Sequence, residues 1–292
     1  MHRLKSWQLF AICVLTWGTT WYAITFQVGR MAPEAAVALR FALAGAVVLA
    51  LCVARGEPLV FSRAQHARLA LQGGCMYGVS YLCVYHAELH VGSALVAVGY
   101  SASPLVTGLG AHWRFGLPVT ERFLLGGVLG LAGVALIFWP EFGAAGGSRD
   151  TVPGVLFTTA AVLLSAVGSL AASRNRLHGL PFWPALGFGM LYGAVVCAIV
   201  AAALGQSFAP PPALAWWLSL LYLSLAGSVL TFACFLTLQE RIGPGPSGAI
   251  GVMTPLLALA VSMTFEGFRP DWLNSLGVLL AAVGNVLMLR RA

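Results

Sequence analysis

Apolar residues follow this chain in runs of about twenty, and short polar, glycine-rich or proline-rich segments separate the runs. A helix of roughly 20 residues matches the hydrocarbon thickness of a bilayer, so runs of this length predict membrane-spanning helices. The clearest breaks are Gly56–Pro58, 143–150 and Ala209–Pro212. The pattern predicts ten spans, at residues 7–26, 33–54, 68–87, 92–115, 122–139, 152–172, 182–204, 214–237, 244–266 and 271–289.

One stretch of the chain occurs twice. Gly92 to Leu136 matches Gly243 to Leu287 without a gap, at an offset of 151 residues. The identical pairs include Gly92 and Gly243, Pro104 and Pro255, Gly116 and Gly267, Gly126 and Gly277, and Gly133 and Gly284. The same offset pairs Cys83 with Cys234 and Tyr81 with Phe232, and an offset of 148 pairs residues 45–48 with 193–196. Self-similarity at a nearly fixed period indicates a duplicated chain.

Each half, residues 1–141 and 142–292, is therefore predicted to hold five spans. Because five is odd, the second half enters the membrane from the side opposite to the first, which makes the repeat an inverted one. The expected fold class is an all-α integral membrane protein with ten transmembrane helices, built as two inverted five-helix repeats. Proteins of this architecture place a substrate site near the midplane, between the halves.

Composition and charge agree with a membrane location. The sequence is 59% hydrophobic and 9% charged, whereas a soluble domain has about 25% charged residues. With the N-terminus in the cytoplasm, twelve of the sixteen Lys and Arg residues fall on the cytoplasmic side, three fall outside, and Arg40 lies within a span. This bias predicts an inner-membrane protein with both termini cytoplasmic. The basic residues are scattered, so nucleic acid is not an expected partner.

Cysteine and histidine spacings give no sign of a metal or cofactor. The six cysteines lie inside apolar runs without CxxC spacing, and we interpret them as small buried hydrophobes. His86, Glu88 and His90 lie at the outer end of the third span, where we expect an exposed loop, since the spacing of a zinc site is absent. The first apolar run contains Trp17 and lacks a cleavage site, so it is expected to be a retained span.

Two prolines interrupt equivalent spans. Pro104 and Pro255 lie near the middle of the fourth and ninth spans. Proline removes a backbone hydrogen bond and kinks a helix, and paired interruptions in the two halves point to a central site. The alternative is a pair of kinks that only shape helix packing.

Aromatic residues form a second pattern, in the third span. Tyr77, Tyr81 and Tyr85 recur every four residues and predict one continuous helical face. Because Tyr77 and Tyr81 lie far from the span ends, we expect them to face a pocket, whereas Tyr85 is also compatible with an interfacial belt.

Further polar and aromatic residues are candidates for the same pocket. They are Trp17 and Trp21 in the first span, Tyr100 and Ser103 in the fourth, Ser165 and Ser169 in the sixth, and Thr231 in the eighth, close to Ser228. Ser and Thr in such helices also bond simply to their own backbone or to a neighbouring helix.

Ionisable residues distinguish the possible transport mechanisms. Arg40 lies six or seven residues inside the second span, and either extends to the outer interface or faces a cavity and binds a substrate carboxylate. No carboxylate falls in the middle of any predicted span. Because a proton-coupled antiporter usually needs one, the sequence favours a facilitator, with coupling through His86 or a loop carboxylate as the alternative.

Several short motifs suggest a family. They are Trp17–Gly18, Arg40–Phe41, Pro104, Pro255 and the closing runs 125–136 and 276–287. Together they resemble the ten-span EamA-type members of the drug/metabolite transporter superfamily. Within that family, the Tyr- and Trp-rich character is similar to the YddG-like aromatic amino-acid exporters. The resemblance implies the ten-span fold and transport of small metabolites. Many members carry Gly-Glu after the fourth and ninth spans, whereas here Glu266 precedes Gly267.

The sequence therefore favours a transporter that exports amino acids, aromatic ones preferred, or related metabolites. We expect a small-molecule substrate and the lipid bilayer as partners, and a monomer or weak homodimer. A multidrug exporter is the nearest alternative, although lipophilic cations would require an intramembrane anion. An intramembrane protease is disfavoured because residues 99–102, Gly-Tyr-Ser-Ala, depart from Gly-x-Ser-Gly. A channel or scaffold is also disfavoured, because inverted repeats with paired kinks suit alternating access better.

Overall fold

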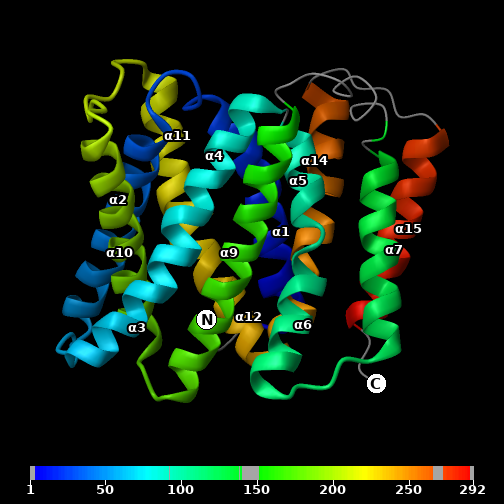
Figure 1. Cartoon of the computed structure of the whole chain (residues 1–292), viewed down its shortest axis with the longest axis horizontal. Coiled ribbons are helices and arrows are strands. Elements are labelled where there is room, and N and C mark those ends of the chain that lie inside the picture. Colours follow the sequence, from blue (N-terminus) through cyan, green and yellow to red (C-terminus); the bar gives the residue numbers. More distant parts are fainter. Residues whose placement is uncertain (1–3, 92, 138, 140–150, 266–271, 290–292) are drawn as a thin grey trace.

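The protein folds into a bundle of helices, seen in a computed structural model that describes residues 4–91, 93–137, 139, 151–265 and 272–289. The predicted break at 143–150 and the Glu266–Gly267 departure lie outside the described residues. Within them the regular structure is helical and contains no strand, which confirms the predicted all-α class. The helices (Figure 1) are α1 (Ser6–Thr25), α2 (Pro33–Ala54), α3 (Arg63–Gly73), η1 (Gly74–Val79), α4 (Ser80–His90), α5 (Ser93–Tyr100), α6 (Ser103–Phe115), α7 (Glu121–Ile137), α9 (Thr151–Leu177), α10 (Phe182–Ala203), α11 (Leu214–Ser224), η2 (Leu225–Leu230), α12 (Thr231–Ile242), α13 (Pro244–Ser247), α14 (Ile250–Phe265) and α15 (Trp272–Leu289).

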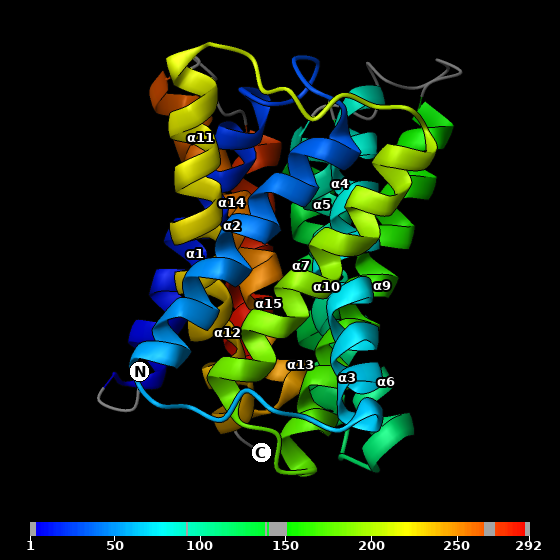
Figure 2. The same ribbon diagram turned by 90° about the vertical axis from the view of Figure 1, so that its left-hand side faces the viewer.

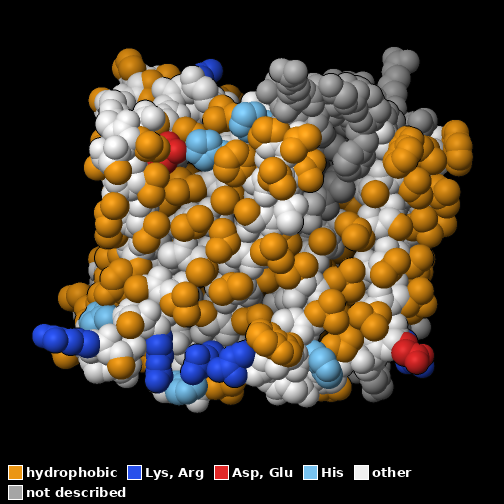
Figure 3. Space-filling model, viewed as in Figure 1, with side chains coloured by type: hydrophobic (Ala, Val, Ile, Leu, Met, Phe, Trp, Pro, Cys, Tyr) orange, Lys and Arg blue, Asp and Glu red, His pale blue; other side chains and the backbone are white. Residues whose placement is uncertain are grey.

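The outside of the bundle is apolar, as a lipid-facing surface requires. Among the described residues, five segments are individually long and apolar enough to cross a membrane: Pro33–Ala54, Val152–Leu177, Phe182–Ala203, Leu214–Ile242 and Trp272–Leu289. Leu163, Val195 and Leu279 leave at least half of their surface exposed. Figure 3 shows hydrophobic side chains over the middle of one face and basic side chains mostly along its lower edge. The number of ten spans stays a prediction.

Local sequence signals explain where several helices begin and end. Ser62 caps α3, because its Oγ accepts a hydrogen bond from the backbone N–H of Gln65 at 3.3 Å. Pro33 begins α2, where its fixed φ fits and its missing N–H costs nothing. Gly116 ends α6 with φ of 67°, a left-handed conformation that glycine adopts without strain.

Helices at equivalent positions of the two halves pair with each other in opposite directions. A Cβ added to Gly133 of α7 would lie 2.5 Å from the backbone N of Ala281, while Gly126 meets Met288. Residue numbers thus rise along α7 as they fall along α15, so these two helices are antiparallel and packed backbone to backbone. Figures 1 and 2 show both chain ends towards the lower side of the bundle.

The second such pair is α2 with α10, which lie side by side in Figure 2. Gly45 meets Gly187, and the guanidinium of Arg55 lies 5.5 Å from the ring centre of Trp183. This pairing is antiparallel as well. Two antiparallel pairs of equivalent helices are the arrangement that an inverted repeat generates.

Two short π-helical segments also follow the repeat. η1 and η2 each hold six residues, and Gly74 to Val79 lands on Leu225 to Leu230 at the offset of 151 residues. A π-helix adds residues to the turn, so the four-residue spacing of an α-helical face does not continue through it. η1 contains Tyr77 and ends before Tyr81, so the predicted face of Tyr77, Tyr81 and Tyr85 is not regular α-helix throughout, although Tyr77 and Tyr81 both contact Phe41 and Phe232.

The two helices that carry the prolines are both divided, but not at the same place. In the first half the break lies between Tyr100, the end of α5, and Ser103, just before Pro104. In the second half the break lies between Ser247 and Ile250, and α14 continues through Pro255. The prolines are equivalent in sequence, whereas the breaks are displaced relative to them.

The two divided helices cross in close contact. A Cβ on Gly248 would lie 2.8 Å from Cα of Pro104, and one on Gly251 would lie 2.6 Å from the carbonyl oxygen of Tyr100. Only glycine allows this approach. The crossing brings irregular backbone from both halves to one place inside the bundle, where protein rather than lipid surrounds it.

Candidate functional site

A central cavity of about 100 Å³ lies where the divided helices cross. Its walls come from the first, third and fourth spans of each half, namely α1, η1 with α4, and α5 with α6 on one side, and α9, α12 and α14 on the other. The lining side chains are mostly aromatic, aliphatic or hydroxyl-bearing. Among the described residues that line it, none carries a charge.

The cavity wall is built from residues that the repeat makes equivalent. At the offset of 151 residues, the wall contains the pairs Tyr81 and Phe232, Val84 and Phe235, Tyr100 and Gly251, and Ser103 and Thr254. Two of these pairs are in mutual contact: the Tyr81 and Phe232 rings lie 6.2 Å apart, and Gly251 packs on the Tyr100 carbonyl. The pseudo-twofold axis that relates the halves therefore passes through the cavity.

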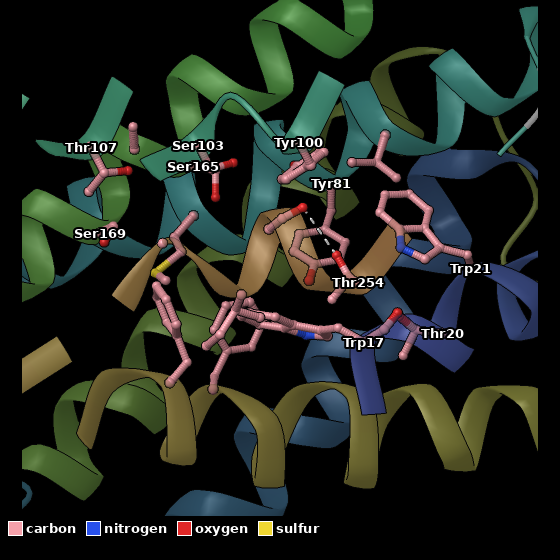
Figure 4. A pocket seen from close by; sticks show the side chains of 18 of the residues that line it. Trp17, Thr20, Trp21, Tyr81, Tyr100, Ser103, Thr107, Ser165, Ser169 and Thr254 are labelled. Carbon is pink, nitrogen blue, oxygen red and sulfur yellow. Dashed lines mark hydrogen bonds between the residues drawn. The ribbon is translucent and has the colours of Figure 1, made fainter. Parts of the chain in front are cut away.

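One end of the cavity is aromatic. Trp21 contacts Tyr100 edge-on, with ring centres 5.9 Å apart, and Trp17 packs on Phe232 at 5.1 Å. The indole Nε1 of Trp17 donates a hydrogen bond of 3.1 Å to the carbonyl of Gly227 in η2. In Figure 4, Trp17, Thr20 and Trp21 lie together on the right.

The opposite end is lined by hydroxyl groups. Ser103, Thr107, Ser165 and Ser169 lie together on the left of Figure 4, and they come from α6 and α9. The Oγ of Ser169 donates to Oε1 of Gln239 at 2.6 Å, and the Gln239 amide donates to Ser173 Oγ at 2.6 Å and to the Ser169 carbonyl at 3.0 Å. We call these three residues the Gln239 clasp. It ties α9 to α12 at this end of the cavity.

Two polar atoms of the cavity residues have no protein partner. Nε1 of Trp21 and Oγ of Ser103 are buried and make no hydrogen bond with any described residue. A buried polar group without a partner costs about 1–3 kcal/mol. A bound ligand that accepts from the indole and exchanges a hydrogen bond with the serine would recover this energy.

The structure brings seven of the twelve predicted site residues together around the cavity: Trp17, Trp21, Tyr81, Tyr100, Ser103, Ser165 and Ser169. The other five do not line it. Pro104 and Pro255 lie in the divided helices, where Pro104 packs on Gly248. Thr231 donates its Oγ1 hydrogen to the carbonyl of Ala226 at 2.7 Å, a bond within its own helical segment.

Tyr77 and Arg40 are buried behind the cavity wall. Tyr77 is fully buried between Phe41 and Phe232, with ring centres 5.5 and 4.8 Å away. Arg40 is 1% exposed and contacts the outer face of Tyr81. Of the two alternatives for Arg40, extension to the outer interface is therefore excluded, and Arg40 lies beside the cavity without lining it.

Sequence reasoning missed part of the lining. Phe232, Phe235, Gly251 and Thr254 all line the cavity, and each is the repeat equivalent of a lining residue in the first half. The repeat offset was the signal that could have found them. Met76 gave no such signal, because its place on the wall depends on the π-helical turn of η1.

The C-terminal end of α4 differs from the exposed loop that we predicted. His86 and His90 lie on α4, and their rings stack on Phe157 at 5.3 and 6.0 Å. The Nε2 atom of His86 lies 2.8 Å from the carboxylate of Glu34, which is 4% exposed. These contacts fasten α4 to α2 and α9. The described residues contain no group of three His, Cys, Asp or Glu side chains placed to hold a metal ion.

The fold and cavity are those of a membrane transporter, and comparison with known proteins gives the family. The model of the EamA-like transporter family matches residues 5–139 and again residues 152–290. The chain belongs to this family, which is part of the drug/metabolite transporter superfamily, as the sequence motifs suggested.

Named relatives agree with this assignment. The chain is 28% identical over 281 residues to the uncharacterized inner membrane transporter YedA of Escherichia coli strain K12, covering 94% of this chain and 88% of YedA. It is 22% identical to protein PagO of Salmonella typhimurium, covering 99% of this chain and 94% of PagO, and 24% identical to protein PecM of Dickeya dadantii, covering 90% and 84%. One solved crystal structure shares the fold with a TM-score of 0.77 and 20% identity, covering 97% of this chain and 95% of the other.

Proposed function

We propose that this transporter exports amino acids, aromatic ones preferred, or related small metabolites, by alternating access to the central cavity. The observation that carries the proposal is the cavity itself, which lies on the pseudo-twofold axis and holds two buried polar atoms without partners, Trp21 Nε1 and Ser103 Oγ. A site on such an axis can be exposed to either side by rocking one half against the other.

The lining supports a solute with an aromatic part and polar groups. Trp17, Tyr81 and Phe232 offer ring surfaces, which bind aromatic solutes by edge and offset contacts. The hydroxyl groups at the other end can donate to and accept from amino and carboxylate groups. The similarity to YddG-like exporters noted in the sequence supports the same substrate class.

A multidrug exporter is the second candidate, and the cavity favours it less. Lipophilic cations are best held by a carboxylate, and the described lining residues include none. The same absence of a lining carboxylate supports a facilitator that moves solute down its gradient. The paired helix breaks and the two unpartnered cavity atoms have no evident role in an enzyme, a channel or a scaffold.

We further propose that both termini lie in the cytoplasm of a cell with an inner membrane, and that the halves are residues 1–141 and 142–292. The support is the lower edge of the bundle, where the chain ends lie and where basic side chains gather (Figures 1 and 3). The protein is expected to act as a monomer or weak homodimer, since each chain contains a complete cavity.

Uptake into proteoliposomes tests this proposal. Purified protein is reconstituted and supplied with a panel of radiolabelled amino acids and lipophilic cations, with and without an imposed pH gradient. We expect phenylalanine, tyrosine or tryptophan to equilibrate without accumulation at any pH gradient. Uphill movement driven by the gradient would contradict the facilitator, and transport of the cations alone would favour the multidrug exporter.

A further inference from the structure

Arg40 is a buried cation beside the cavity. Its Nε donates a hydrogen bond of 3.0 Å to Oγ of Ser228, which in turn donates to the carbonyl of Leu223 at 2.9 Å. Its guanidinium carbon lies 4.7 Å from the ring centre of Tyr81 and 5.2 Å from that of Phe41. Ser228 belongs to η2, so the arginine joins α2 of the first half to the π-helical segment of the second.

The guanidinium is incompletely satisfied by the protein. Its Nη1 is buried and has no hydrogen-bond partner among the described residues. The ion pairs in that part of the chain are His86 with Glu34 and Arg176 with Glu240, so Arg40 has no carboxylate within 4.0 Å there. Glu88 lies within electrostatic range, two turns beyond Tyr81 on α4 and outside the cavity wall. A buried charge without a paired counterion is costly.

Only a thin wall separates this charge from the cavity. Tyr81 has the cavity on one side and the guanidinium over its ring. A Cβ added to Gly227 would lie 2.8 Å from Cγ2 of Thr20, a lining residue, and 3.4 Å from Nη2 of Arg40. The missing side chain of Gly227 thus lets the guanidinium approach the wall at Thr20.

We propose that Arg40 selects substrates that carry a carboxylate, by supplying positive charge to the aromatic end of the cavity from behind Tyr81 and Thr20. Trp21 is next to Thr20 in the chain, and its unpartnered indole Nε1 can only donate a hydrogen bond. Both groups therefore favour an acceptor with negative charge. The inference deepens the proposed function, because it specifies the group by which the solute is recognised.

The size of the effect follows from the distance across the wall. At an effective dielectric constant of about 20, a unit charge roughly 8 to 10 Å away changes the affinity for an opposite charge by roughly 15- to 35-fold. The same charge disfavours a cation by a similar factor. Carboxylate and ammonium analogues of one aromatic compound should thus differ clearly in affinity.

Binding to the unmodified protein gives the first test. Purified full-length protein in detergent is titrated with 3-phenylpropionate, which has only the carboxylate, and with phenethylammonium, which has only the ammonium. The rise in Tm reports binding without requiring transport, so a failure of amino-acid transport is distinguishable from a failure of this inference. We expect 3-phenylpropionate to bind more than about 100-fold more tightly, because the charge strengthens binding of the carboxylate and weakens binding of the ammonium. Equal binding, tighter binding of the amine, or no shift with the carboxylate would overturn the proposal.

Variants assign the preference to Arg40. Arg40→Gln should remove most of the carboxylate preference, and Arg40→Lys should retain part of it because it keeps the charge. Arg55→Gln is the matched control, since Arg55 is the residue directly after α2 and lies beside Trp183, away from the cavity. An unchanged preference in a folded Arg40→Gln protein, or an equal loss in Arg55→Gln, would contradict the assignment. Should Arg40→Gln fail to fold, the comparison on the unmodified protein still decides the sign of the effect.

Discussion

At the scale of single residues, two tryptophans have a buried indole N–H without an acceptor among the described residues, and their surroundings differ. Trp21 lines the central cavity, whereas Trp216 is fully buried in α11 and does not line it. A donor left free in a cavity is available to a ligand, but a donor left free in packed protein is only a cost. Trp216 therefore serves as a control when the contribution of the Trp21 N–H to ligand binding is measured.

Trp21→Phe should weaken substrate binding and leave the fold intact. The change keeps an aromatic ring and removes the N–H, so the loss is one hydrogen bond, about 2- to 10-fold in affinity. The measurement is KM for labelled phenylalanine in proteoliposomes, with Trp216→Phe as the control. The interpretation fails if both variants raise KM equally or if neither does.

Tyr81 and Tyr77 should respond differently to truncation. Tyr81 lines the cavity, so Tyr81→Ala should change KM and substrate preference. Tyr77 is fully buried against Gly189, Gly193 and two phenylalanines, so Tyr77→Ala should cost about 3 kcal/mol of stability by leaving a void. Thermal unfolding and transport are measured on both. A stable Tyr77→Ala protein with altered preference would show that Tyr77 contacts substrate after all.

The sequence anticipated much of the wall of the cavity but not the residues just behind it. Spacing and residue type pointed to Trp17, Trp21, Tyr100 and Ser103, because aromatic and polar side chains within a span need an inward environment. The same reasoning could not place Arg40 or Tyr77. Their position depends on which helix packs on their side, and a single sequence does not record that.

At the scale of helices, the irregular segments matter most. η1 and η2 occupy equivalent places, and each contributes to the site: Met76 of η1 lines the cavity, and the Gly227 carbonyl of η2 accepts the Trp17 bond. Segments of π-helix often occur at functional sites. Apolar periodicity predicted both spans as regular helices, since a π-turn changes the register without changing composition.

The Gln239 clasp should limit access to the cavity from the end where the chain termini lie. Gln239→Ala removes all its side-chain bonds to α9, so a cysteine at position 165 in the cavity should react faster with a membrane-impermeant thiol reagent added on that side. We expect an increase of several-fold, in a background without native cysteines. Thr237→Ala is the control, because Thr237 bonds only to the Ala233 carbonyl of its own helix. No change in rate with Gln239→Ala would mean that the clasp does not control access.

The contact between α7 and α15 should depend on its glycines. A Cβ on Gly133 would meet Ala281 N at 2.5 Å and the Gly277 carbonyl at 2.6 Å, so Gly133→Ala should force the helices apart and cost about 1–3 kcal/mol. Gly74→Ala is the control, since a Cβ there would lie 3.8 Å from a Val196 methyl, an ordinary van der Waals contact. Thermal unfolding in detergent compares the two. Equal stability would show that the backbone contact contributes little.

At the scale of the whole molecule, the two halves meet around the cavity, and each half makes a contact of its own at one end of it. The Gln239 clasp joins α9 to α12 at one end, and Trp21 meets Tyr100 at the other. The volume of about 100 Å³ is small beside the roughly 300–1,000 Å³ of ordinary ligand sites. A solute larger than this volume needs a wider cavity, as the proposed alternating access would provide.

The overall architecture was more accessible from sequence than its details. The repeat offset and the apolar runs predicted an all-helical bundle, and α7 with α15 and α2 with α10 pair as an inverted repeat requires. The positions of the breaks were less accessible, because Pro104 stands at a helix start while Pro255 stands within a helix. The position at which a helix is interrupted depends on the neighbouring backbone, which here is the contact of Gly248 and Gly251 with the partner helix.

Alternating access to this cavity is tested most directly at Thr254, which lines it from α14. Thr254→Cys is placed in a background without native cysteines, and the purified protein is reconstituted in one orientation. An impermeant thiol reagent is then added to one side of the membrane at a time, with and without phenylalanine. We predict modification from both sides and protection by phenylalanine against both. Modification from one side only, or modification that phenylalanine does not slow, would contradict the account.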